Sequence, residues 1–105
     1  MSPQPFVVEV AESAAADLEE VLAWYAAQDV PEVGIRLVRA VRERLDQLRQ
    51  FPESGAVLEE FDNPNLRQLI HPPFRIVYRF TGEKVVVVRI WRFERLLADD
   101  TAELG

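Results

Sequence analysis

The sequence of 105 residues contains no cysteine, one histidine and four glycines. The absence of cysteine excludes a disulfide framework and thiolate chemistry, and it is compatible with the reducing cytoplasm, where we expect the protein to reside. No basic stretch followed by an apolar run lies near the N-terminus, so we expect no secretory signal. No apolar run approaches the roughly 18 residues that a membrane-spanning helix needs, so we expect no membrane contact.

Residues suited to metal or cofactor chemistry are equally scarce. With one histidine, no cysteine and no carboxylate pair at ligand spacing, the sequence offers no metal site. It also contains no glycine-rich phosphate loop and no G-x-S-x-G motif. We therefore expect no cofactor, no metal and no small-molecule substrate. His71 lies beside two prolines in a turn, and we interpret it as incidental to any catalysis.

The composition is that of one ordinary globular domain, which we expect to span residues 1–105 with a tail from about residue 97. The net charge is −6, but it is unevenly distributed. Residues 1–32 contain seven acids and no base, whereas residues 64–95 contain seven bases and two acids. Eleven of the twelve bases are arginine, which makes bidentate contacts with carboxylates and phosphates. This predicts a basic binding surface on an acidic body, whose net charge argues against unspecific polyanion binding.

A short strand and two helices are predicted for the first half of the chain. Residues 6–10 are β-prone, and apolar residues then recur at helical spacing over residues 12–27 and again over residues 31–50. Ser13 is the expected N-cap of the first helix, and Pro31 suits the first turn of the second. Two such helices joined by a short loop form an antiparallel hairpin.

The outer face of the second helix carries charges of both signs. Arg39 and Glu43 are four residues apart, as are Arg42 and Asp46, and this spacing favours ion pairs on a solvated face. The alternative is that this face contacts a partner.

Residues 66–95 predict three strands, separated by Pro72-Pro73 and by the turn at residues 81–84. In the second strand, aromatic and aliphatic residues alternate with arginine. The third contains the run Val85–Val88, which predicts a central strand covered on both faces. The element order β-α-α-β-β-β indicates an α+β fold, in which a helical hairpin packs on a small antiparallel sheet.

The sheet also carries the candidate binding residues. The residues expected to contact a target or partner are Arg67, Arg75, Arg79, Arg89, Trp91, Arg92 and Arg95. For Arg89, Arg92 and Arg95, salt bridges to Glu94 or to the acidic first helix are the structural alternative.

Five segments, in this order, resemble the RelE/ParE toxin superfamily of bacterial type II toxin–antitoxin systems. They are residues 15–21 (AADLEEV), 45–55 (LDQLRQFPESG), 66–69 (LRQL), 74–79 (FRIVYR) and 88–95 (VRIWRFER). The resemblance covers roughly residues 6–97. It implies the fold described above and a cognate antitoxin that wraps an acidic and apolar segment over the toxin.

The resemblance implies one of two activities. ParE-like members, whose helical hairpin is longer, inhibit DNA gyrase, and the expected helix lengths favour this group. The target would then be bound through the arginine-bearing end of the sheet and the C-terminal segment. RelE-like members cleave mRNA on the ribosome, for which Arg67, Arg75 and Glu60 are the candidate catalytic residues. Many of these relatives carry histidine where this chain has Arg92, so the nuclease set is incomplete. A third alternative is a non-toxic binding module.

Overall fold

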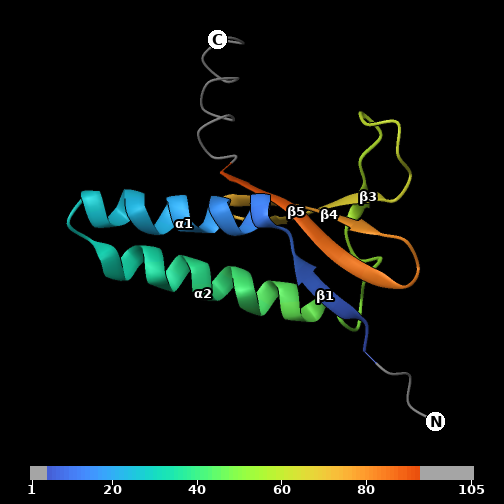
Figure 1. Cartoon of the computed structure of the whole chain (residues 1–105), viewed down its shortest axis with the longest axis horizontal. Coiled ribbons are helices and arrows are strands. Elements are labelled where there is room, and N and C mark those ends of the chain that lie inside the picture. The colour runs from blue at the N-terminus through green and yellow to red at the C-terminus, as the bar shows by residue number, and fades with distance from the viewer. Residues whose placement is uncertain (1–4, 93–105) are drawn as a thin grey trace.

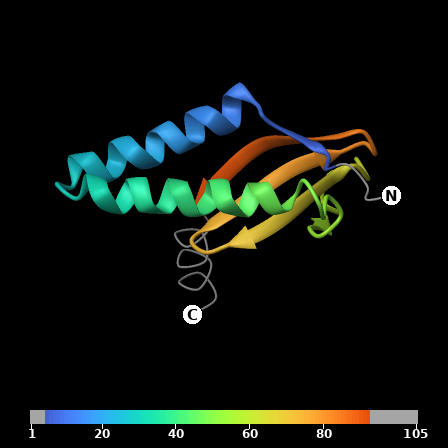
Figure 2. The ribbon, with the colours of Figure 1, turned by 90° about the horizontal axis from the view of Figure 1, so that it is seen from below.

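The computed structural model describes residues 5–92 as a two-layer α+β structure. A pair of helices lies against one face of a five-stranded sheet (Figures 1 and 2). The elements are β1 (Val7–Val10), α1 (Glu12–Ala27), α2 (Pro31–Gln47), β2 (Ala56–Val57), β3 (Leu66–His71), β4 (Phe74–Phe80) and β5 (Lys84–Arg92). The predicted helical hairpin and three consecutive strands are thus confirmed. The two-residue strand β2 was not predicted.

The strand order is β1-β5-β4-β3-β2, so the first and last strands are neighbours. β1 pairs with β5 in parallel, and the other three pairs are antiparallel, which makes the sheet mixed rather than purely antiparallel. The predicted central position of β5 is therefore correct. The prediction that both its faces are covered is wrong: Val85 and Val87 are fully buried, whereas Val86 and Val88 are only half-buried.

The helix boundaries depart from the predictions at two points. α1 covers the predicted residues, but its N-cap is Ala11, and the Ser13 hydroxyl instead donates a hydrogen bond of 2.6 Å to the Val88 carbonyl. α2 begins at Pro31 as expected and ends at Gln47, three residues early. Between the helices, Asp29 adopts a positive φ of 63°, which a short polar side chain tolerates well.

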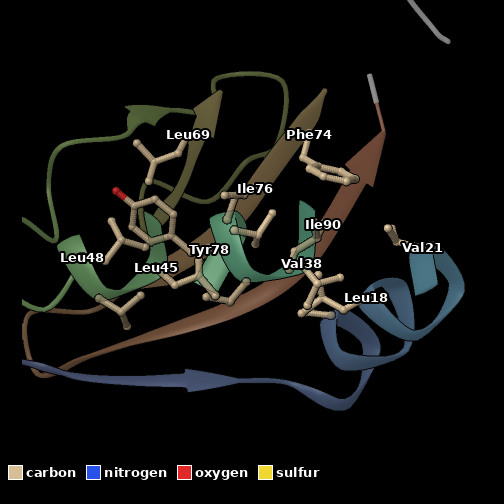
Figure 3. Close-up of a cluster of buried hydrophobic side chains, with 14 of the residues drawn as sticks. Leu18, Val21, Val38, Leu45, Leu48, Leu69, Phe74, Ile76, Tyr78 and Ile90 are labelled. Carbon is tan, nitrogen blue, oxygen red and sulfur yellow. The ribbon is translucent and has the colours of Figure 1, made fainter. Parts of the chain in front are cut away.

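The core lies between the helices and the inner face of the sheet. Alternate residues of β4, namely Phe74, Ile76 and Tyr78, are fully buried, as the alternation in the sequence predicted. Figure 3 shows them in one cluster with side chains from both helices. The helices contribute Leu18, Val21, Val38, Val41 and Leu45, among others, and Leu48 joins them directly after the end of α2. The side chains between them belong to the opposite, outer face of the sheet.

Tyr78 joins this core to the loop that follows α2. Its hydroxyl donates a 2.7 Å hydrogen bond to the Pro52 carbonyl and accepts one of 2.9 Å from the Gly55 amide. Burial raises the pKa of Tyr78 above its ordinary value, although the Gly55 amide and the charge of Arg67 oppose the shift. Gly55 has no room for a side chain, because a Cβ atom there would lie 2.6 Å from the Tyr78 hydroxyl.

Replacing Tyr78 by phenylalanine should destabilise the fold. The substitution leaves the Pro52 carbonyl and the Gly55 amide without their buried partner, a loss of about 1–3 kcal/mol in the free energy of unfolding. Urea denaturation measures this change. Tyr25→Phe is the matched control, since no hydrogen bond of its hydroxyl occurs within residues 5–92. Equal stabilities of the two variants would contradict this role of Tyr78.

The same pair of proteins should differ in its dependence on pH. Because the pKa of folded Tyr78 is raised above 10.0, its contribution to stability is complete below that pH. It decreases once the unfolded tyrosine ionises and is lost as the pH passes the folded pKa. The free energy of unfolding of the wild type should therefore fall more steeply above pH 10 than that of the Tyr78→Phe variant.

Candidate binding surfaces

The pairing of β3, β4 and β5 distributes the candidate arginines over two faces of the sheet. Arg75 and Arg79 alternate with buried residues of β4 and therefore lie on the outer face. Trp91 is directly opposite Arg75 in the register, and Arg89 is opposite Val77. These four candidates share the outer face, as the sequence predicted. Within residues 5–92, Arg79 is exposed and makes no ion pair.

Arg67 and Arg92 lie on the other face, so the prediction of one common surface is wrong for them. Arg67 is opposite Tyr78, and its guanidinium donates hydrogen bonds to the carbonyls of Glu53 and Gly55 at 3.1 and 2.8 Å. Arg92 is opposite Phe74, and its guanidinium lies 5.2 Å from the ring centroid of Trp24 in α1. Both arginines therefore contact elements of the helix side. The remaining candidate, Arg95, is outside the described residues.

On the outer face, Arg75, Gln68, Trp91 and Arg89 form what we call the outer-face cluster. Arg75 donates a 2.6 Å hydrogen bond from Nε to Gln68 and forms an ion pair with Glu60. The guanidinium carbons of Arg75 and Arg89 lie 5.8 and 5.2 Å from the ring centroid of Trp91. A cation within about 6 Å of an indole ring is attracted by the ring's π-electrons, so Trp91 holds both arginines near their observed positions.

Arg89 is also bound by Asp17 of α1, the one buried charged side chain of residues 5–92, which is 8% exposed. Asp17 accepts hydrogen bonds from Nε and Nη2 of Arg89, both at 2.9 Å, and from the Ile90 amide at 2.8 Å. The hydrogen bonds to Asp17 raise the pKa of Arg89. For Arg89, the structural alternative considered from the sequence, a salt bridge to the acidic first helix, is thus the one observed.

Asp17 was not among the predicted site residues, although the sequence holds a signal for it. It is three residues after Ala14 and four before Val21, so it lies on the apolar face of its own helix. A carboxylate on such a face must find a partner in the folded protein.

Of the three candidate nuclease residues, Arg75 and Glu60 are in contact, and Arg67 lies apart from them. Arg67 and Arg75 project from opposite faces of the sheet, and Glu60 is engaged by Arg75 rather than placed as a free base. His71 is at the end of β3 and makes no ion pair within residues 5–92. Within residues 5–92 there is no group of three potential metal ligands and no helix long and apolar enough to cross a membrane.

A second surface, which we call the hairpin groove, runs along α2. One hollow of about 290 Å³ lies between α2 and the edge strand β1, and another of about 200 Å³ lies between α1 and α2. Val10, Arg42 and Leu45 line both, so the two hollows are adjacent. The first is also lined by Val8, Arg39, Glu43, Asp46 and Arg49, and the second by Ala15, Leu18, Glu19, Leu22 and Val38.

The ion pairs predicted for this face of α2 do not form. Asp46 pairs with Arg49 at 3.2 Å instead of with Arg42, and Arg39 has no carboxylate within ion-pair distance in the described part of the chain. The groove therefore combines an apolar floor with charges of both signs, among which Arg39 and Arg42 make no ion pair within residues 5–92. This favours the alternative considered from the sequence, in which the face contacts a partner.

Comparisons with known proteins agree on one group of relatives. Residues 8–97 match the family model described as "ParE toxin of type II toxin-antitoxin system, parDE". A solved chain of the chromosomal ParDE toxin–antitoxin system from Pseudomonas aeruginosa is similar at 27% identity and a TM-score of 0.70, covering 83% of this chain and 95% of that chain. A chain of the toxin–antitoxin complex RelBE2 from Mycobacterium tuberculosis shares the fold at 21% identity and a TM-score of 0.65, with coverages of 84% and 98%. A search of curated proteins gave no match.

Replacement of Asp17 by alanine should destabilise the protein. The Ile90 amide would lose its buried acceptor, which lowers the free energy of unfolding by about 1–3 kcal/mol. Asp17→Asn keeps an acceptor oxygen and should lose less. Glu9→Ala, which removes the exposed pair with Lys84, serves as the control and should change stability by less than about 1 kcal/mol. Urea denaturation of the three variants gives the ranking, and a loss for Asp17→Ala no larger than for Glu9→Ala would contradict it.

Proposed function

The chain belongs to the ParE toxin family of type II toxin–antitoxin systems, and from this premise we propose that it inhibits DNA gyrase and that a cognate antitoxin neutralises it. The observation that carries the proposal is the outer-face cluster. It presents arginine and tryptophan side chains held by neighbours, and the carboxylates beside them, Glu60 and Asp17, are both paired with its arginines. Such a surface is suited to binding another protein, since tryptophan and arginine contribute most to many interfaces.

The helical hairpin supports the same assignment. α1 and α2 have 16 and 17 residues, and the resemblance associates a longer hairpin with ParE-like members. The ribosome-dependent nuclease remains the alternative activity in the superfamily. No observation favours it here, because Arg67 lies on the other face of the sheet from Arg75, and Glu60 is already paired with Arg75.

The hairpin groove is the proposed antitoxin site. An acidic and apolar antitoxin segment would place its apolar side chains on the floor formed by Val10, Leu18 and Leu45, and its carboxylates near Arg39 and Arg42. The adjoining β1 is an edge strand, so its free side is open to addition of a further strand. The groove and the outer-face cluster lie on opposite faces of the sheet, which gives the two partners separate contacts.

Purified toxin at micromolar concentration should block DNA supercoiling by gyrase or stabilise gyrase-cleaved DNA. Arg79→Ala should weaken the inhibition severalfold, because it removes a charge from the outer face of the sheet. Arg95→Ala should do the same, because the sequence assigns Arg95 to target binding. Arg36→Ala, an exposed change on α2, is the control and should leave inhibition unchanged. Normal supercoiling in the presence of the toxin would exclude gyrase as the target. Cleavage of mRNA on programmed ribosomes would instead support the nuclease.

Binding of the antitoxin should stabilise the toxin, and Arg42→Glu should weaken that binding at least tenfold. At an antitoxin concentration 100 times the Kd, the free energy of unfolding should rise by about 2.7 kcal/mol. Titration calorimetry and thermal melting measure the two effects. Arg79→Glu makes the same charge change on the opposite face and should leave antitoxin affinity intact. An unchanged melting temperature with saturating antitoxin would contradict the proposed complex.

A further inference from the structure

The ion pair between Arg75 and Glu60 differs from the other ion pair of the outer-face cluster. Asp17 is buried and accepts three hydrogen bonds, so its pairing with Arg89 is part of the folded framework. The side chain of Glu60 is 57% exposed, and Arg75 is its one partner in residues 5–92. It also lies in the irregular connection between β2 and β3. Glu60 can therefore leave Arg75 without disrupting the core.

Arg75 would keep its position when Glu60 leaves. Its Nε is bonded to Gln68, and its guanidinium lies over Trp91, so two contacts remain. The contact that would be lost is the one between Nη2 of Arg75 and the Glu60 carboxylate. A carboxylate supplied by another molecule could then take that place with little rearrangement of the arginine, and its binding would compete directly with Glu60.

We propose that Glu60 occupies, within the free toxin, the place of a carboxylate of the target protein, and that the outer-face cluster binds an acidic, partly apolar segment of that protein. This inference rests on the proposed function, in which the toxin acts by binding a target. It assigns Arg75 as the main anchor and Glu60 as an internal competitor that weakens target binding until it is displaced.

The neighbouring residues indicate the chemistry of that segment. Ile70 is directly opposite Arg75 in the register and is 49% exposed, so an apolar side chain of the partner can pack beside the carboxylate. Arg79 lies further along the same face of β4 and offers a second cation. A nucleic acid fits less well, because a protein of net charge −6 repels a polyanion over longer distances.

The test compares Glu60→Gln with Glu59→Gln, which removes the same charge from the adjacent exposed residue. Affinity for purified gyrase without DNA is measured by biolayer interferometry, and circular dichroism melting verifies that each variant is folded. Glu60→Gln should bind three- to tenfold more tightly than Glu59→Gln. Arg75→Gln should bind at least tenfold more weakly than wild type, and the double variant should behave like Arg75→Gln, since removal of the competitor has no effect without the arginine.

Growth arrest on induction of each variant provides a second readout that does not depend on gyrase. Glu60→Gln should arrest growth at a lower inducer concentration than Glu59→Gln, and Arg75→Gln should not arrest it.

If folded variants all bind gyrase equally and arrest growth equally, the inference fails while the gyrase assignment stands. If gyrase is not bound but the growth order holds, the inference stands and the gyrase assignment fails. If gyrase binding appears only when a DNA duplex is present, the ligand of the outer-face cluster is a nucleic acid rather than an acidic protein segment, and the inference is overturned.

Discussion

The structure depends on how β5 is paired beyond the point where β1 ends. β1 pairs with β5 only as far as Val87, so the following residues would leave unpaired backbone groups beside α1. The start of α1 supplies the missing partners. The Ala11 amide donates to the Val87 carbonyl at 2.9 Å, and the side chains of Ser13 and Asp17 bond to the backbone of Val88 and Ile90. A helix therefore continues the edge contact that a strand began, and this contact sets the position of the hairpin on the sheet.

The same contact determines what each face of the sheet presents. The register of β4 and β5 shifts next to Val77 and Tyr78, where Val88 is the additional residue of β5. Beyond this irregularity, Ile90 returns to the core, and Arg89 and Trp91 remain with Arg75 on the outer face. The helix side of the sheet thus carries the apolar core and the hairpin groove, and the outer face carries the charged and aromatic residues of the outer-face cluster. The separation of the two proposed binding surfaces follows from sheet geometry.

Much of the fold was predictable from the sequence, because it is encoded in local patterns. Helical periodicity gave the two helices, and the alternation in β4 gave its buried face. The distribution of the arginines over the two faces of the sheet was harder to predict from the sequence. The sequence shows which residues of one strand share a face. Which face of β3 continues the buried face of β4 depends on the pairing register, so Arg67 could not be assigned to the helix side. The partners of Glu60 and Asp17 are 15 and 72 residues away from them, and no local pattern reports such contacts.

The parallel pairing of β1 with β5 has a consequence for synthesis of the protein. Residues 7–10 find their sheet partner in residues 84–87, close to the end of the described chain. Contacts between such distant segments form slowly, since a long loop must close first. During translation β1 must therefore wait until residues 84–87 have emerged, and the hairpin groove that β1 borders cannot form before then. The sheet consequently acquires its first strand only after the ribosome has added its last.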